Sequence, residues 1–155
     1  MKAAYIFSKE FVPPSKLAHM LELIADKINA RIVEPSGTDG WQILRDEPRL
    51  PIQYGEVQTE YFSLKFKIET GFWQAPKITY KDNVYRILIG IIRGVECDYL
   101  QYDFLNEFFE RYPDMILQDS DSKMIFSPDL TRKLKESGDI YWLYKGGDIF
   151  VDRFD

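Results

Sequence analysis

The sequence predicts one α+β domain over residues 1–155, with two main helices packed on a mainly antiparallel sheet. Two segments, 15–28 and 103–112, repeat apolar residues at helical spacing. Short apolar runs lie before, between and after them, separated by turn-forming residues, which is typical of strands. No repeat, low-complexity tract or linker divides the chain. A ferredoxin-like core with a C-terminal hairpin extension is one arrangement that fits this order.

The first helix is the clearest element of the N-terminal part. It follows a strand predicted at Ala3 to Phe7, begins at Pro13-Pro14 or Ser15 and ends near Asn29. Its apolar stripe consists of Leu17, Met20, Leu21, Ile24 and Ile28. A second strand is predicted at Arg31 to Glu34. The glycines and prolines between Ser36 and Gly55 indicate a long irregular connection with at most one short element around Trp41 to Leu44.

The middle of the chain has the pattern of antiparallel strands. Residues 61–68 alternate, with Phe62, Leu64, Phe66 and Ile68 on one face. Segments 77–81 and 84–92 flank Asp82-Asn83, a pair that tolerates the positive φ of a tight hairpin turn. Because residues 87–92 are apolar on both faces, we expect a central strand there.

The C-terminal part contains a second helix, a third, shorter helix and two hairpins. Asp103 can cap the second helix, whose buried stripe would be Leu105, Phe108, Phe109 and Tyr112, and Pro113 would end it. Segments 115–117 and 124–126 bracket a polar turn. Ser127-Pro128 begins the short helix, which ends at Gly138. Residues 140–154 form the last hairpin.

These periodic segments predict a single hydrophobic core. Each residue expected in it lies on the apolar side of its segment. The set is Leu21, Phe62, Leu64, Phe66, Ile87, Ile89, Leu105 and Phe108.

Composition narrows the function classes. The chain has 20 Lys and Arg against 25 Asp and Glu, a net charge of −5, which opposes binding to phosphate backbones. No apolar run approaches the length that spans a bilayer. The single cysteine, Cys97, excludes an internal disulfide and fits a reducing compartment. We therefore expect a cytoplasmic protein with neither a nucleic-acid nor a membrane partner.

We identify no catalytic residue, cofactor site or metal ligand, and we expect a non-enzymatic role. His19 is the only histidine, and it fits a surface or structural position. Acidic neighbours disfavour a thiolate at Cys97. The carboxylates of Asp148, Asp152 and Asp155 lack the spacing of a calcium loop.

Residues 96–114 contain six acidic residues and one basic residue, Arg111. The net charge of this segment therefore equals that of the whole chain. One interpretation is a solvated helix face; the other is a docking surface for a basic partner, with tyrosines that supply buried contact. In the second interpretation the partner-binding residues are Glu96, Asp98, Tyr99, Tyr102, Asp103, Glu107 and Glu110. The four carboxylates from Asp98 to Glu110 would then lie largely exposed.

This profile, a small acidic domain with many aromatic residues and no catalytic set, resembles that of the immunity proteins that neutralise bacterial toxins. The resemblance implies a protein-binding module that occludes a basic partner or toxin active site. One alternative is a small enzyme or ligand-binding domain with a pocket under the 36–55 loop, lined by Trp41, Tyr54, Trp73 and Tyr80. Another is a structural or homodimeric subunit that uses an exposed sheet face.

Overall fold

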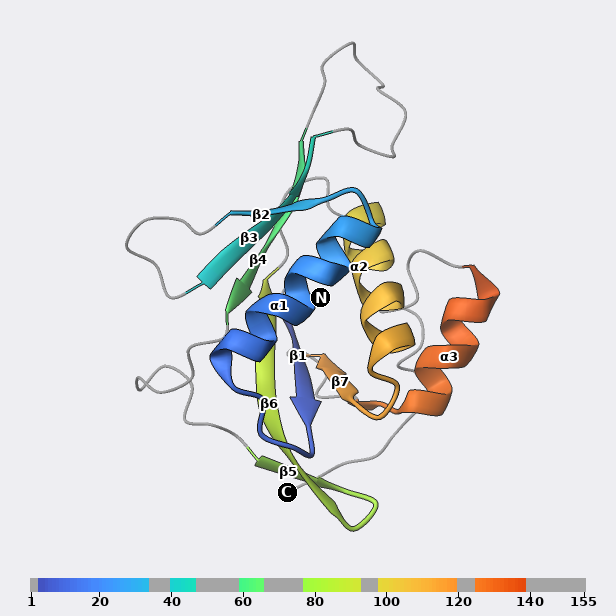
Figure 1. Cartoon of the computed structure of the whole chain (residues 1–155). Coiled ribbons are helices and arrows are strands. Elements are labelled where there is room, and N and C mark those ends of the chain that lie inside the picture. The colour runs from blue at the N-terminus through green and yellow to red at the C-terminus, as the bar shows by residue number, and fades with distance from the viewer. Residues whose placement is uncertain are drawn as a thin grey trace.

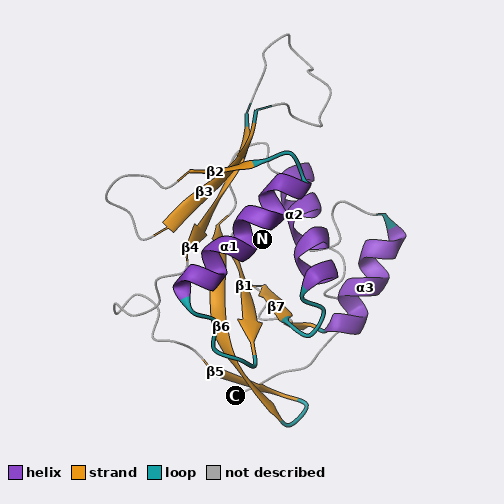
Figure 2. Ribbon diagram, in the orientation of Figure 1, coloured by secondary structure: helices purple, strands orange, loops and turns teal. Residues whose placement is uncertain are grey.

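The computed structural model describes residues 3–33, 40–46, 59–65, 77–92, 98–119 and 125–138. These residues form an antiparallel sheet of eight strands and three helices (Figure 1, Figure 2). The strands are β1 (Ala3–Ser8), β2 (Arg31–Val33), β3 (Gly40–Arg45), β4 (Glu60–Lys65), β5 (Lys77–Tyr80), β6 (Asn83–Ile92), β7 (Ile116–Asp119) and β8 (Ile125–Phe126). The helices are α1 (Pro14–Lys27), α2 (Asp98–Arg111) and α3 (Pro128–Ser137). The predicted α+β class is confirmed. The ferredoxin-like arrangement stays a prediction, and the hairpin at 140–154 lies outside the described residues.

The sheet is organised around β6. The strand order is β2-β3-β4-β6-β1-β7-β8, and β5 pairs with the remaining part of β6. β6 therefore contacts β1, β4 and β5, and its residues 87–91 are all buried. The expectation of a central strand is confirmed.

The predicted helix boundaries at α1 and α3 are also confirmed. α1 begins after Pro13 and buries the expected stripe from Leu17 to Ile24, whereas Ile28 is half-buried just beyond the end of the helix. Asn29, the next residue, has a φ of 57°. In α3 the Ser127 hydroxyl accepts a hydrogen bond from the Leu130 amide, and Gly138 takes the left-handed conformation at the other end. No helix in the described part of the chain is long and apolar enough to cross a membrane.

The hairpin between β5 and β6 has a two-residue turn. Tyr80 pairs with Asn83, and the turn residues Lys81 and Asp82 have φ values of 48° and 65°. Two successive positive φ values match the right-handed twist of the flanking strands. The turn thus lies one residue earlier than the predicted Asp82-Asn83.

β3 is the short element expected around Trp41 to Leu44, and it extends from Gly40 to Arg45 within the 36–55 segment. It is a six-residue strand with β2 on one side and β4 on the other. Gly40 permits its close approach to β4, because a Cβ atom there would collide with the Leu64 carbonyl oxygen. A glycine that looks like a loop residue in the sequence is therefore a packing requirement of the sheet.

The main core lies between the helices and one face of the sheet. Figure 1 shows α1 and α2 crossing that face side by side. Their apolar stripes pack on residues of β1, β3, β4, β6, β7 and β8, and Phe62 and Phe104 meet edge to face at 5.2 Å. The buried members of the predicted core set in this cluster are Leu21, Phe62, Leu64, Ile89, Leu105 and Phe108.

The prediction of a single core is wrong at Ile87. This residue belongs to a second cluster on the opposite sheet face, with Phe7, Ile116, Ile125 and residues of the β5–β6 hairpin. The cause is a β-bulge: Ile6 pairs with Ile89 but Phe7 pairs with Ile87, so Leu88 is an extra residue on β6. The bulge changes which face successive side chains occupy. Phe66 lies outside the described residues.

Candidate functional site

A groove of about 790 Å³ lies between the C-terminal end of α1, the β2–β3 pair and α2. We call it the α1–α2 groove. It is lined by residues 27–31 and 44–46, by Asp103, Asn106 and Glu107 of α2, and by Lys135 of α3. Its volume is in the range of ligand-binding clefts.

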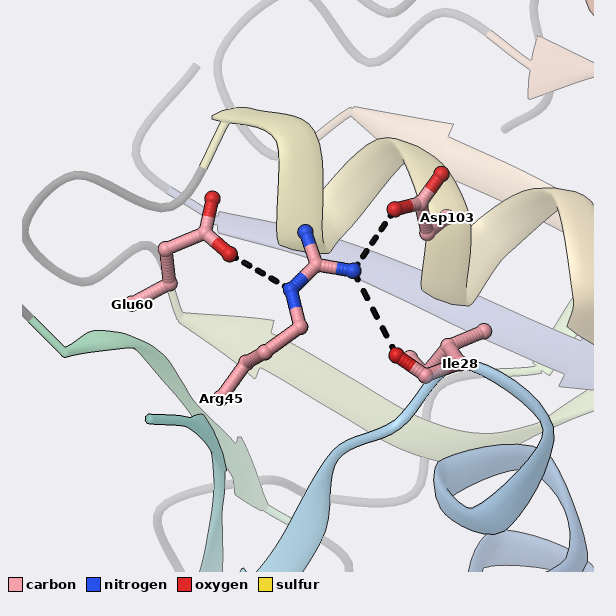
Figure 3. Close-up of polar contacts among 4 residues, drawn as sticks. All are labelled: Ile28, Arg45, Glu60 and Asp103. Atoms are coloured by element: carbon pink, nitrogen blue, oxygen red, sulfur yellow. Dashed lines mark hydrogen bonds and ion pairs between the residues drawn. The ribbon is translucent and has the colours of Figure 1, made fainter. Parts of the chain in front are cut away.

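Arg45 connects the walls of this groove (Figure 3). Its Nε donates to Glu60 Oε2 at 2.6 Å, and its Nη1 donates to Asp103 Oδ2 at 2.7 Å. Nη1 also lies 3.4 Å from the carbonyl oxygen of Ile28 at the end of α1. One guanidinium thus joins β3, β4, α1 and α2.

The strand register explains why an ion pair is buried here. Arg45 and Glu60 are direct partners across β3 and β4. Arg45 lies on the same face as Ile43, and Glu60 on the same face as Phe62, so both side chains point to the helix side. The side chains of Arg45, Glu60 and Asp103 are 7%, 0% and 20% exposed.

The electrostatics of this cluster favour charged groups. Burial by itself lowers the pKa of Arg45, but the hydrogen bonds to Glu60 and Asp103 outweigh it and raise that pKa above its usual value. Arg45 and Asp103 of this cluster line the groove, whereas Glu60 is fully buried and lies outside the groove lining.

Three buried polar atoms at this position lack a hydrogen-bond partner among the described residues. They are Arg45 Nη2, Glu60 Oε1 and Asn106 Oδ1. A buried donor or acceptor without a partner costs about 1–3 kcal/mol. Such departures from the usual rules of protein interiors concentrate at functional sites.

Two further ion pairs lie at the groove. Arg31 contacts Asp46 through Nε at 2.8 Å and Nη2 at 3.2 Å, and hydrogen bonding raises the pKa of Arg31 and lowers that of Asp46. On α2, Glu107 pairs with Arg111 at 3.0 Å.

The structure corrects two expectations for the acidic segment. Asp103 is not a helix cap, because α2 already begins at Asp98. Nor are Asp103 and Glu107 largely exposed: their side chains are 20% and 19% exposed, and both pair with the protein's own arginines. The physical reason is that the α2 face expected to meet a partner packs beside the Arg45 cluster.

The other predicted partner-binding residues do not form one exposed surface in the described part of the chain. Glu110 is 66% exposed but pairs with Lys135 of α3, which lowers the pKa of Glu110. Tyr99 and Tyr102 are half-buried, and Tyr102 packs against the main core. Glu96 and the Asp98 side chain lie outside the described residues.

The alternative pocket and the remaining candidates can be placed in part. Trp41 packs against the main core, whereas Tyr80 belongs to the second cluster, so the structure does not bring these two together. Tyr54 and Trp73 lie outside the described residues, as do Cys97 and the C-terminal aspartates. His19 is exposed on α1. Among the described residues, no group of three or more His, Cys, Asp or Glu side chains could hold a metal ion.

Sequence reasoning missed Arg45 and Glu60, although one signal was present. The alternation that places Phe62 and Leu64 inward also places Glu60 inward when it is extended back two residues. An inward acid at the start of an amphipathic strand requires a buried cation. The identity of that cation, Arg45, depends on a strand pairing that the sequence does not display.

Comparison of the chain with known protein families, characterised proteins and solved structures finds no match. The function is therefore inferred from the residues of the site itself.

Proposed function

We propose that the chain is a non-enzymatic protein-binding module whose α1–α2 groove receives a segment of a partner polypeptide. The observation that carries the proposal is the base of this groove, where Arg45 lies between two carboxylates and buried polar atoms lack a hydrogen-bond partner among the described residues. Buried charges in a cleft focus its electric field toward an incoming charged group.

The charge distribution in the groove supports a polypeptide with both signs of charge. Asp103 and Glu107 place carboxylates in the α2 wall, whereas exposed Lys27 at the end of α1 forms no ion pair with a described residue. Arg31, Glu107 and Lys135 are already paired. A partner segment with a basic side chain toward the α2 carboxylates and an acidic one near Lys27 would complement this pattern.

Photo-crosslinking in the native cell tests the proposal. A benzoylphenylalanine at Lys27 should capture one discrete protein, and the same group at Lys77 on β5, far from the groove lining, should not. Excess unlabelled protein should compete for this capture, whereas the Lys27→Glu/Arg31→Glu variant should not. Lys77→Glu/Arg86→Glu, which makes the same charge change at exposed positions of β5 and β6, is the matched control. Equal competition by both variants would contradict docking in the groove.

Within this proposal the finer function is inhibition of the immunity type, in which the bound protein is a toxin whose active site becomes covered. The resemblance in profile supports it, together with the acidic residues of α2 that line the groove. The captured protein should then lose its activity when mixed with one equivalent of the chain. A captured enzyme that stays fully active would exclude inhibition while leaving protein binding intact.

A further inference from the structure

A second, smaller cavity of about 310 Å³ lies beside the groove, and we call it the Trp41 pocket. Its walls are Trp41 and Ile32 of neighbouring strands and Glu22, Ala25 and Asp26 of α1, with Ala30 and Arg31 at the boundary shared with the groove. The pocket lining therefore combines an aromatic and an aliphatic side chain with two carboxylates. This combination recognises an organic cation, because the ring face and the carboxylates both attract positive charge.

The positions of the two acidic residues of the pocket on α1 are electrostatically unfavourable. Glu22 and Asp26 are four residues apart on one helix face, where like charges destabilise a helix. Asp26 also lies in the last turn, where the helix dipole disfavours negative charge. Both are exposed, and neither side chain forms an ion pair or hydrogen bond with a described residue. Nearby Arg31 is held in a two-bond contact with Asp46 instead.

We propose that the Trp41 pocket binds an arginine side chain of the partner polypeptide. The guanidinium would lie between the Trp41 ring and the carboxylates of Glu22 and Asp26, and its methylenes would contact Ile32 and Ala25. The bound charge relieves the repulsion between the two acids and the unfavourable position of Asp26. This inference takes from the proposed function only the idea that the ligand belongs to a polypeptide.

Titration with N-acetyl-arginine amide, followed by NMR of the labelled protein, tests the pocket without any partner. The expected result is a saturable shift of the Trp41 indole N–H and of the Glu22 and Asp26 amides, which weakens with added salt. N-acetyl-citrulline amide has nearly the same shape without the charge and should produce no such shift. Equal shifts with both amides, or none with the arginine amide, would overturn the inference.

Substitution separates binding from structure. Glu22→Gln/Asp26→Asn should weaken binding of the arginine amide roughly fivefold, the effect of two solvent-accessible ion pairs. The matched control, Asp114→Asn/Glu136→Gln, removes the same charge from exposed positions and should leave binding unchanged. The pocket variant should melt at or above the wild-type temperature, because it removes a like-charge pair. A lower melting temperature would assign the acids a structural role and count against the proposal.

Crosslinking at Lys27 and titration with the arginine amide test the two proposals separately. If crosslinking captures a partner but the arginine amide does not bind, the partner docks without an arginine in the Trp41 pocket, and only this inference falls. If the arginine amide binds but crosslinking at Lys27 captures nothing, the pocket stands and docking in the groove is contradicted.

Discussion

Arg45 of β3 and Asp103 of α2 are 58 residues apart in the sequence, yet their side chains meet at 2.7 Å. Because Glu60 occupies the other edge of the same guanidinium at 2.6 Å, this contact fixes α2 to the β3–β4 pair through buried charge. Buried ion pairs of this kind contribute less to stability than their short distances suggest, since each charge loses its hydration. Removal of only one partner destabilises the fold strongly, because the remaining charge stays buried without a counterion.

Replacement of Arg45 by methionine should destabilise the protein by about 3–5 kcal/mol, because it leaves the buried Glu60 carboxylate without its cation. The variant Arg45→Met/Glu60→Leu/Asp103→Leu, which removes all three charges, should recover most of that loss. Urea denaturation of the single and triple variants measures both values. A triple variant no more stable than the single one would show that the three groups stabilise the fold as a unit.

Alanine at Gly40 should destabilise the protein by about 1–3 kcal/mol, the usual cost of overpacking. Its Cβ would collide with the Leu64 carbonyl oxygen, so the β3–β4 pair has to separate. Gly90→Ala is the matched control in the neighbouring part of the sheet, because a Cβ there would meet the Tyr5 ring at an ordinary 3.4 Å. Thermal melts should separate the two variants; equal losses would contradict the close approach at Gly40.

The Asp46 carboxyl should titrate below its ordinary value of about 3.9, since the hydrogen bond from Arg31 lowers its pKa. A carboxyl whose pKa is lower in the folded state stabilises the fold above the unfolded pKa, and this contribution is lost as the pH falls through the folded pKa. The Arg31→Ala variant should return the Asp46 pKa toward the ordinary value and lose less stability on acidification below pH of about 4. Carboxyl carbon NMR gives the titration directly, and identical curves in the two proteins would refute the pairing.

Most of the fold that can be predicted from the sequence depends on local periodicity. The stripe from Leu17 to Ile24 and the alternation around Phe62 depend on near neighbours in the chain, and both match the structure. The β5–β6 turn lies one residue before its predicted position. The difference arises because Lys81 is an unusual residue for positive φ and Asn83 a common one.

The errors arise where distant residues decide the outcome. The bulge at Leu88 follows from pairing with β1, and it moves Ile87 to the other sheet face without any local signal. In the sequence Asp103 resembles a helix cap because it precedes an apolar stripe, but its carboxylate forms an ion pair with Arg45. The candidate site is built from such long-range pairs, so the composition of residues 96–114 indicated the acidic residues of its α2 wall but not its geometry.

The place of β1 in the sheet has a consequence for synthesis. Ile6 pairs with Ile89 on one side and Leu117 on the other, so β1 leaves the ribosome before either of its neighbours has been made. The β5–β6 hairpin, by contrast, closes through two residues, and hairpins form in about 1–10 μs. β6 is therefore a ready template when β1 docks. Until then the apolar strand is a target for chaperones and for self-association.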